Sequence, residues 1–477
     1  MTAVDGKAAA TSENGEPPAA APAPLPLRRN RDFNLLWSGQ ALSDMGTQMS
    51  TIAYPLLILA LTGSAAKAGI VGSATIVGTL LWLLPAGVAA DRWPRKKVML
   101  TTSIIQLIVG GSVVPAIVTH HVYLIHLVIV GFVQGSALAF YTGAARGALR
   151  RVVPLEQLPE AFSRTQARDR AAVMLGPPIG STLFSVAPYL PFAVDSVSFG
   201  AITLAASLMR KNLNPDKSSI PLELQSMRMH QRVLLGMRYV FSNPYLRMVV
   251  IWATVVNGVI AGVRLTSIVL AEHLGASAPE IGTLFSISAA IGLVGAIFAK
   301  RIVSLLGERR LVQLVSIAFP LCSLGMAYTP TFWLISIAAG LTGLFLMPIN
   351  VVLMSRAAQL APDHLQAQMS NAMQLCWTSL MAVSPAIFGT ITDRIGPRAM
   401  ITVAAVIYAL IAVWMLSRKS MNLLQRKGDS AVPEEVAAKN LPVPGPEDPA
   451  APDTVADDAS QDSQEPTNAA AESPSPA

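Results

Sequence analysis

Long apolar stretches separated by short polar connections run through this chain from Phe33 to Leu416. A helix needs about 20 apolar residues to cross a bilayer, and each stretch is roughly that long. The pattern therefore predicts an all-α membrane protein. Its twelve predicted transmembrane helices lie at residues 33–62, 67–90, 98–119, 123–147, 167–188, 191–209, 246–272, 281–300, 311–328, 332–355, 367–390 and 399–417.

The connection at residues 210–245 is longer than the others and rich in Lys, Arg, Pro and Asn. We predict that it is a cytoplasmic linker between two pseudo-symmetric six-helix halves, residues 33–209 and 246–417. Residues 1–32 and 418–477 flank the apolar region, and their composition predicts two disordered cytoplasmic arms. The second arm is acidic, with eleven acids and one base from position 428 onward.

The composition agrees with this pattern. Hydrophobic residues make up 52% of the chain and charged residues only 13%, with a mean hydropathy of +0.50. Soluble domains carry about 25% charged residues. Both cysteines, Cys322 and Cys376, lie inside apolar stretches, so we expect neither a disulfide framework nor a metal site. The chain offers no nucleophile–base set and no phosphate-binding loop, so we expect neither an enzyme nor a bound cofactor.

The basic residues predict the orientation of the helices. With the N-terminus inside, the inner segments and adjoining helix ends hold 29 Lys and Arg residues, whereas the outer loops hold three. Because Lys and Arg gather on the cytoplasmic side, both termini are predicted to be cytoplasmic, in the cell's cytoplasmic membrane. The net charge of +7 is thus explained by membrane topology, and we expect no nucleic-acid partner.

The first predicted helix carries a polar face that includes Gln40, Asp44 and Gln48, spaced by four residues. Asp44 lies about 16 Å into the helix at 1.5 Å per residue. A charged carboxylate at such a depth costs on the order of 3 kcal/mol, and such residues usually face a cavity. We identify Asp44 as the candidate proton-coupling residue. A purely structural carboxylate and a direct substrate contact remain alternatives.

A turn with one acid and four bases joins the second and third predicted helices. Its marked residues are Gly87, Asp91, Arg92 and Arg95, and an acid placed there can pair with a neighbouring helix end. The alternative is a loop that only sets topology. A similar pattern around Asp393, on the predicted outer face, has two interpretations: a relic of internal duplication, or an outer loop that tolerates arginine beside an acid.

Other polar groups lie within the predicted spans. Gly176, Pro177 and Gly180 predict a flexing point in the fifth helix, since proline removes a backbone donor. Arg264 is the only base well inside a span, and its possible partners are Asp44 and Glu272. The remaining candidates for a cavity wall are Asp195, Asn257, Asn350, Asn371 and Gln374.

Several motifs together resemble the macrolide-efflux and enterobactin-exporter branch of the major facilitator superfamily. They are the opening at residues 28–46, the Asp91-Arg92 turn, Gly176-Pro177 with Gly180, residues 195–199 and residues 361–364. The resemblance covers residues 27–416 and implies alternating access and export driven by the proton gradient. It also implies that Gly87, Asp91, Arg92 and Arg95 form an inner gate latch.

These observations lead to one functional prediction. We expect a secondary active exporter of lipophilic or amphipathic small molecules, such as a drug, antibiotic or siderophore-like compound, working by proton antiport. An importer or a lysophospholipid flippase of the same fold is the main alternative. A transport-silent membrane sensor is a third. The expected partners are the substrate, protons and membrane lipids, and the expected state is a monomer.

Overall fold

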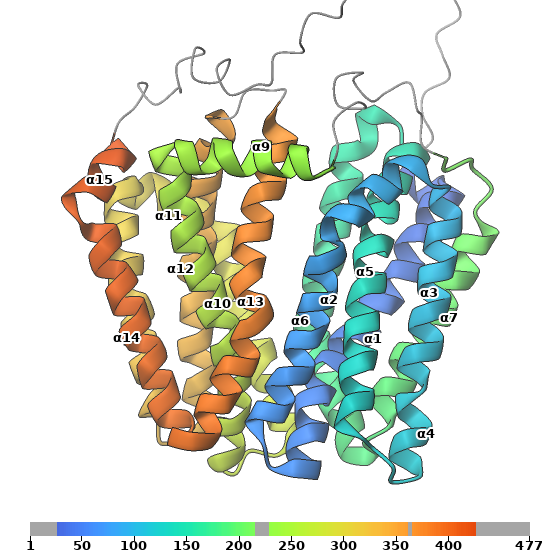
Figure 1. Cartoon of the computed structure of the whole chain (residues 1–477), viewed down its shortest axis with the longest axis horizontal. Coiled ribbons are helices and arrows are strands. Elements are labelled where there is room, and N and C mark those ends of the chain that lie inside the picture. The colour runs from blue at the N-terminus through green and yellow to red at the C-terminus, as the bar shows by residue number, and fades with distance from the viewer. Residues whose placement is uncertain (1–25, 215–228, 361–364, 426–477) are drawn as a thin grey trace, which may run out of the picture. The chain divides into compact units, whose positions relative to one another are not determined.

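The computed structural model describes residues 26–214, 229–360 and 365–425. Most of the two predicted arms lies outside these ranges. Within them the regular secondary structure is helical (Figure 1). The elements of the first half are η1 (Leu27–Arg29), α1 (Arg31–Thr62), α2 (Ala65–Arg92), α3 (Arg95–Gly111), α4 (Val113–Val118), α5 (Leu124–Val152), η2 (Leu155–Gln157), α6 (Leu158–Val186) and α7 (Leu190–Leu208).

The second half begins with a helix that the sequence pattern did not predict. Residues 229–242, inside the expected linker, form α9 (Met229–Ser242), which Figure 1 shows lying across the ends of the long helices. Tyr239 of α9 is buried, and its hydroxyl donates to the carbonyl of Leu360 at 2.5 Å. The other elements are α10 (Pro244–His273), α11 (Ala278–Ala327), α12 (Phe332–Gln359), α13 (Gln366–Ile395), α14 (Pro397–Leu416) and α15 (Arg418–Gln425).

Ten helices in the described ranges are long and apolar enough to cross a membrane. The prediction of twelve differs from this number at two places. Helix α11 counts once, although Gly307, at φ 72°, interrupts its helical backbone between the predicted spans 281–300 and 311–328. Helix α6 is not among the ten, and its first half carries Arg164, Arg168 and Asp169.

Short capping sequences set the ends of several helices. Asn30 begins α1 by accepting a hydrogen bond from the backbone of Phe33 at 3.1 Å, and Gly63 ends it at φ 62°. Left-handed backbone at a helix end favours glycine because that residue has no Cβ. Gly396, at φ 85°, separates α13 from α14 in the same way. These turns allow successive long helices to run antiparallel.

The two halves contact each other through α2 with α13 and through α6 with α11. We call the end where α1 begins the basic end, after Arg92, Arg95 and Lys96, and the other end the opposite end. At the opposite end, Asp393 accepts hydrogen bonds from Ser64 Oγ at 2.6 Å and from the backbone N–H of Ala65 at 2.8 Å. The carboxylate thus caps the first turn of a helix from the other half.

Candidate functional site

Two adjoining cavities lie along α1. The first cavity, about 630 Å³, is lined by α1, α3, α5, α6 and α7, all from the first half. The central cavity, about 530 Å³, is lined by both halves, with α10 and α13 contributing from the second. Thr47 and Gln48 of α1 line both, so the polar face predicted for this helix does border open space. Both volumes lie within the ordinary range of small-molecule sites.

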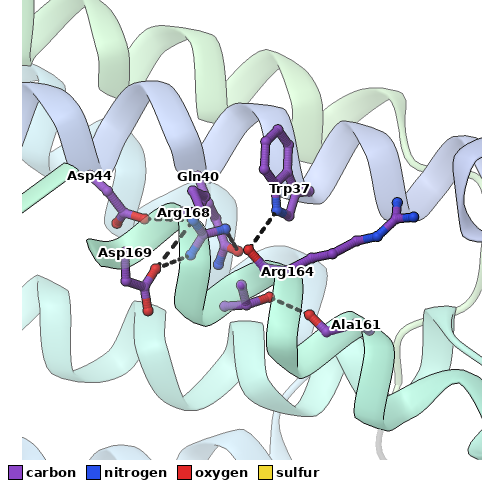
Figure 2. Close-up of polar contacts among 8 residues, drawn as sticks. Trp37, Gln40, Asp44, Ala161, Arg164, Arg168 and Asp169 are labelled. Atoms are coloured by element: carbon purple, nitrogen blue, oxygen red, sulfur yellow. Dashed lines mark hydrogen bonds and ion pairs between the residues drawn. The ribbon is translucent and has the colours of Figure 1, made fainter. Parts of the chain in front are cut away.

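The first cavity contains a guanidinium shared between two helices (Figure 2). Arg168 of α6 places Nε 2.9 Å from Asp44 Oδ2, and its Nη1 donates to Gln40 Oε1 at 2.7 Å. The same side chain binds Asp169 Oδ1 through Nη2 at 2.8 Å. Only 8% of the Arg168 side chain is exposed, against 39% for Asp44. One buried cation therefore serves two carboxylates and one amide.

The helical repeat explains why these groups meet. Gln40 and Asp44 stand one turn apart on α1, so both face α6. Trp37 lies one turn earlier, and its indole N–H donates to the carbonyl of Arg164 at 3.3 Å. This second contact between α1 and α6, visible in Figure 2, holds the helices in register near Arg168. A guanidinium with so little exposed surface is stabilised by the acceptors around it, which here are the two carboxylates and the Gln40 amide.

Sequence reasoning did not identify Arg168 as part of the site. It considered Arg264 as a partner for Asp44, but the structure pairs Asp44 with Arg168. Arg264 instead lies with its guanidinium carbon 5.2 Å from the ring centre of Phe285. The available signal was the sequence Arg168-Asp169-Arg170 just before the apolar part of the fifth predicted helix. A carboxylate inside a span needs a counter-charge, and this cluster places two bases at the start of another predicted span.

The central cavity contains a second carboxyl group, Asp195 of α7, which is 4% exposed. Its recorded hydrogen-bond partners are hydroxyl groups on α1. Ser50 donates to Oδ2 in a short hydrogen bond, and Thr47 donates to Oδ1 at 3.4 Å. Ser50 Oγ is also 3.0 Å from the carbonyl of Gly46, so its hydrogen has two available acceptors. The Asp195 carboxyl can therefore exist with or without a proton and keep its hydrogen-bond partners.

The other cavity candidates divide into two groups. Gln40 and Gln48 line the first cavity, and Gln48, Asp195 and Arg264 line the central one. The rest line neither of these cavities, namely Asn257, Asn350, Asn371 and Gln374. The amide of Asn257 donates to the carbonyl of Ala253 on its own helix at 2.8 Å. In this conformation these four residues therefore lie apart from the site.

The predicted flexing point is packed between two helices. A Cβ at Gly176 would overlap the side chain of Gln48, and one at Gly180 would lie 2.6 Å from the Cα of Met49. On another side, α11 approaches so closely that a Cβ at Gly282 would lie 2.6 Å from the carbonyl oxygen of Pro177. Helix α6 therefore contacts α1 of its own half and α11 of the other half along the same segment.

The predicted gate loop joins elements of the first half. Helix α2 continues to Arg92, and α3 begins at Arg95. The Arg95 guanidinium donates to the carbonyls of Ala90, at 3.1 Å, and Gly147, at 3.2 Å, so it links α2 to α5. A Cβ at Gly87 would meet no atom within 4 Å. The side chain of Asp91 lies outside the described part of the structure.

Comparisons with known proteins agree with this architecture. Macrolide efflux protein A of Streptococcus pyogenes is 30% identical over 158 residues, which is 32% of this chain and 38% of that protein. The chain thus matches well under half of that relative's length. The multidrug efflux pump Tap of Mycobacterium tuberculosis (strain ATCC 25618 / H37Rv) is 24% identical over 404 residues, covering 79% of this chain and 92% of that one.

Solved structures show the same fold. The nucleoside transporter NupG superposes with a TM-score of 0.64 at 13% identity, covering 83% of this chain and all of that one. A bacterial homologue of the lysosomal transporter Spinster gives 0.63 at 13% identity, over 83% and 98%. The sequence model of the Major Facilitator Superfamily matches residues 36–385 and, overlapping it, residues 260–445. This chain is a multi-pass membrane transporter and belongs to the Major Facilitator Superfamily.

Proposed function

We propose that this transporter exports lipophilic or amphipathic small molecules in exchange for protons, by alternating access. Its efflux-pump relatives support the direction of transport. The clustering of bases at one end supports a cytoplasmic location for that end and for both termini, in the cytoplasmic membrane. Under this topology the contacts between Asp393 and α2 lie on the outer side, so the described conformation is closed outward.

The observation that carries the proposal is the shared Arg168 guanidinium. Its ion pair with Asp44 links α1 to α6, whereas its contact with Asp169 stays within α6. A proton on Asp44 cancels that carboxyl's charge, and the guanidinium then pairs with Asp169 alone. Protonation at one atom therefore weakens one contact between helices and leaves the contact within α6 in place. This is the kind of two-state element that coupling requires.

The same helix carries the effect to the other half. About two turns after Arg168, Ser286 of α11 donates to the carbonyl of Met174 on α6 at 2.5 Å. Weakening this one contact between α1 and α6 therefore acts on a helix that also contacts the second half. Both halves line the central cavity, so a movement of α6 that shifts the two halves also changes the binding site of a substrate there. Proton binding and substrate binding are then linked, and each alters the affinity for the other.

The test is substrate-triggered proton movement in inverted membrane vesicles, with a panel of antibiotics, siderophores and dyes. Wild type is compared with Asp44→Asn and Asp195→Asn at matched amounts of inserted protein. We expect a proton signal in wild type that Asp44→Asn abolishes and Asp195→Asn keeps. A signal lost only in Asp195→Asn moves coupling to that residue. If no compound gives a signal in wild type, the importer, flippase or sensor hypothesis replaces export.

A further inference from the structure

The central cavity contains a cation, Arg264, that forms no ion pair among the described residues. Arg264 of α10 lines this cavity and also a neighbouring one of about 200 Å³. Among the described residues, Arg264 forms no hydrogen bond or ion pair, whereas the ion pairs of α1 and α6 use Arg164 and Arg168. The contact it does make is with the face of Phe285 on α11. A base in this setting normally faces an acid or a ligand.

The nearby acid forms no ion pair with Arg264 among the described residues. Asp195 lines the same cavity, and its oxygens accept hydrogen bonds from Ser50 and Thr47 instead. Asp44 is paired with Arg168 in the first cavity. Tyr54 also lines the central cavity, and its hydroxyl donates to Gln134 at 3.1 Å. The N–H donors of the Arg264 guanidinium are therefore available to bind a ligand that enters the cavity.

The surrounding walls define what that molecule is. Apart from Arg264, Asp195 and the hydroxyl and amide groups, the two cavities are bordered by apolar side chains such as Ile260, Leu265, Ile268 and Met326. Phe285 covers one face of the Arg264 guanidinium. The edge of the guanidinium presents parallel N–H donors. That edge matches the two oxygens of a carboxylate, phosphate or sulfonate. An apolar body with an acidic head fits both features.

We propose that Arg264 is the anion-binding residue of the central cavity and that the transported molecules are amphipathic anions. This inference rests on the proposed function, because it names the substrate class of the same exporter. The cavity then excludes lipophilic cations, because their charge would meet the like charge of the Arg264 guanidinium. Neutral amphiphiles bind, but without the contribution of a charge-assisted hydrogen bond.

The test uses three probes with one apolar body: 4-(1-pyrenyl)butyrate, 4-(1-pyrenyl)butanol and 4-(1-pyrenyl)butyltrimethylammonium. Binding to the full-length chain in lipid nanodiscs is followed by energy transfer from its seven tryptophans to pyrene. We expect the butyrate to half-saturate wild type at a concentration at least tenfold lower than the butanol. The ammonium probe should show no saturable binding. Equal binding of all three probes to wild type overturns the inference, and this comparison needs no variant.

Three variants locate the preference. Arg264→Gln should make the butyrate bind like the butanol, while Arg264→Lys should keep part of the difference. Arg301→Gln, at an exposed arginine of α11 outside these cavities, is the control and should bind like wild type. A butyrate preference that survives in Arg264→Gln also overturns the inference. Probe binding is measured without a proton gradient, so a failure of proton-coupled export does not change the binding result. A failure of the binding test likewise does not change the proton signal in vesicles.

Discussion

At the scale of single residues, the few charged side chains within the helices determine the proposed coupling. Arg168 is 8% exposed and contacts Asp44, Asp169 and Gln40 at once. Such a side chain cannot be replaced by another base without loss, because lysine offers one compact charge and arginine a planar fork. The importance of Arg168 therefore lies in its shape as well as its charge.

Arg168→Lys should reduce the efflux rate by about tenfold, or ~1.4 kcal/mol, since the ammonium cannot hold all three acceptors together. Arg168→Gln should abolish transport, because Asp44 would then lack a counter-charge. The measurement is efflux of a transported dye, normalised to the amount of protein in the membrane. Arg170→Gln, two residues away and exposed, is the matched control and should resemble wild type. Wild-type rates for Arg168→Gln would refute this account.

The sequence could reveal Asp44 but not its partner. A lone acid in an apolar helix is visible in the residue pattern alone, because its depth follows from its position. Its pairing with Arg168 depends on how α1 packs on α6. The sequence of either helix alone does not show the register in which the two helices pack. The same limit explains Asn371 and Gln374, which have helical spacing but line neither cavity.

At the scale of elements, α6 is confined on two sides. Gly176 and Gly180 allow α1 to approach, and Pro177 presents its carbonyl oxygen to α11. The pattern predicted the start of this helix nine residues too late, at 167 and not at 158, since its first turns are charged and only the apolar part has the signature of a span. It also missed α9, whose polar residues resemble a loop and whose apolar face is apparent only once Tyr239 is seen buried.

Gly180→Ala should lower the thermal stability of the purified protein, because the new Cβ would lie 2.6 Å from the Cα of Met49. Overpacking of this kind costs about 1–3 kcal/mol. The matched control is Gly200→Ala in α7, where a Cβ meets nothing within 4 Å. That control should leave the melting temperature unchanged or slightly higher, since alanine favours helix. Equal melting temperatures for the two variants would contradict this packing.

At the scale of the whole molecule, the two halves meet at the opposite end. Backbone approaches backbone there: a Cβ at Gly69 of α2 would overlap the carbonyl of Pro385 on α13. Asp393, whose sequence context left two interpretations open, accepts three hydrogen bonds at the start of α2, from Ser64 Oγ and from the backbone N–H groups of Ala65 and Ala66. The acid therefore has a structural role in this conformation. The sequence pattern identifies the segment around Asp393 as unusual but does not show that it contacts α2.

Gly69→Ala should open the opposite end, whereas Gly72→Ala, one turn later, should not, because its Cβ would lie a comfortable 3.9 Å from the Pro385 side chain. A cost of ~1–3 kcal/mol shifts a two-state equilibrium by about fivefold to 150-fold. Labelling of a cysteine at position 51, in a background lacking Cys322 and Cys376, by an impermeant maleimide applied from that side measures the shift. Identical labelling rates for the two alanine variants would exclude this interpretation.

The contact between Gly282 and Ser181 has a consequence for how the sequence can change. A side chain at position 282 would overlap Ser181 Oγ and also the carbonyl oxygen of Pro177, so the residue tolerated in one half depends on both the backbone and the side chain of the other. Substitutions at these two positions are therefore epistatic, and the halves cannot diverge independently. A chimera that joins the first half of this protein to the second half of a relative needs a small residue at both positions. Without that match, each half can fold correctly and the assembled chain still fails.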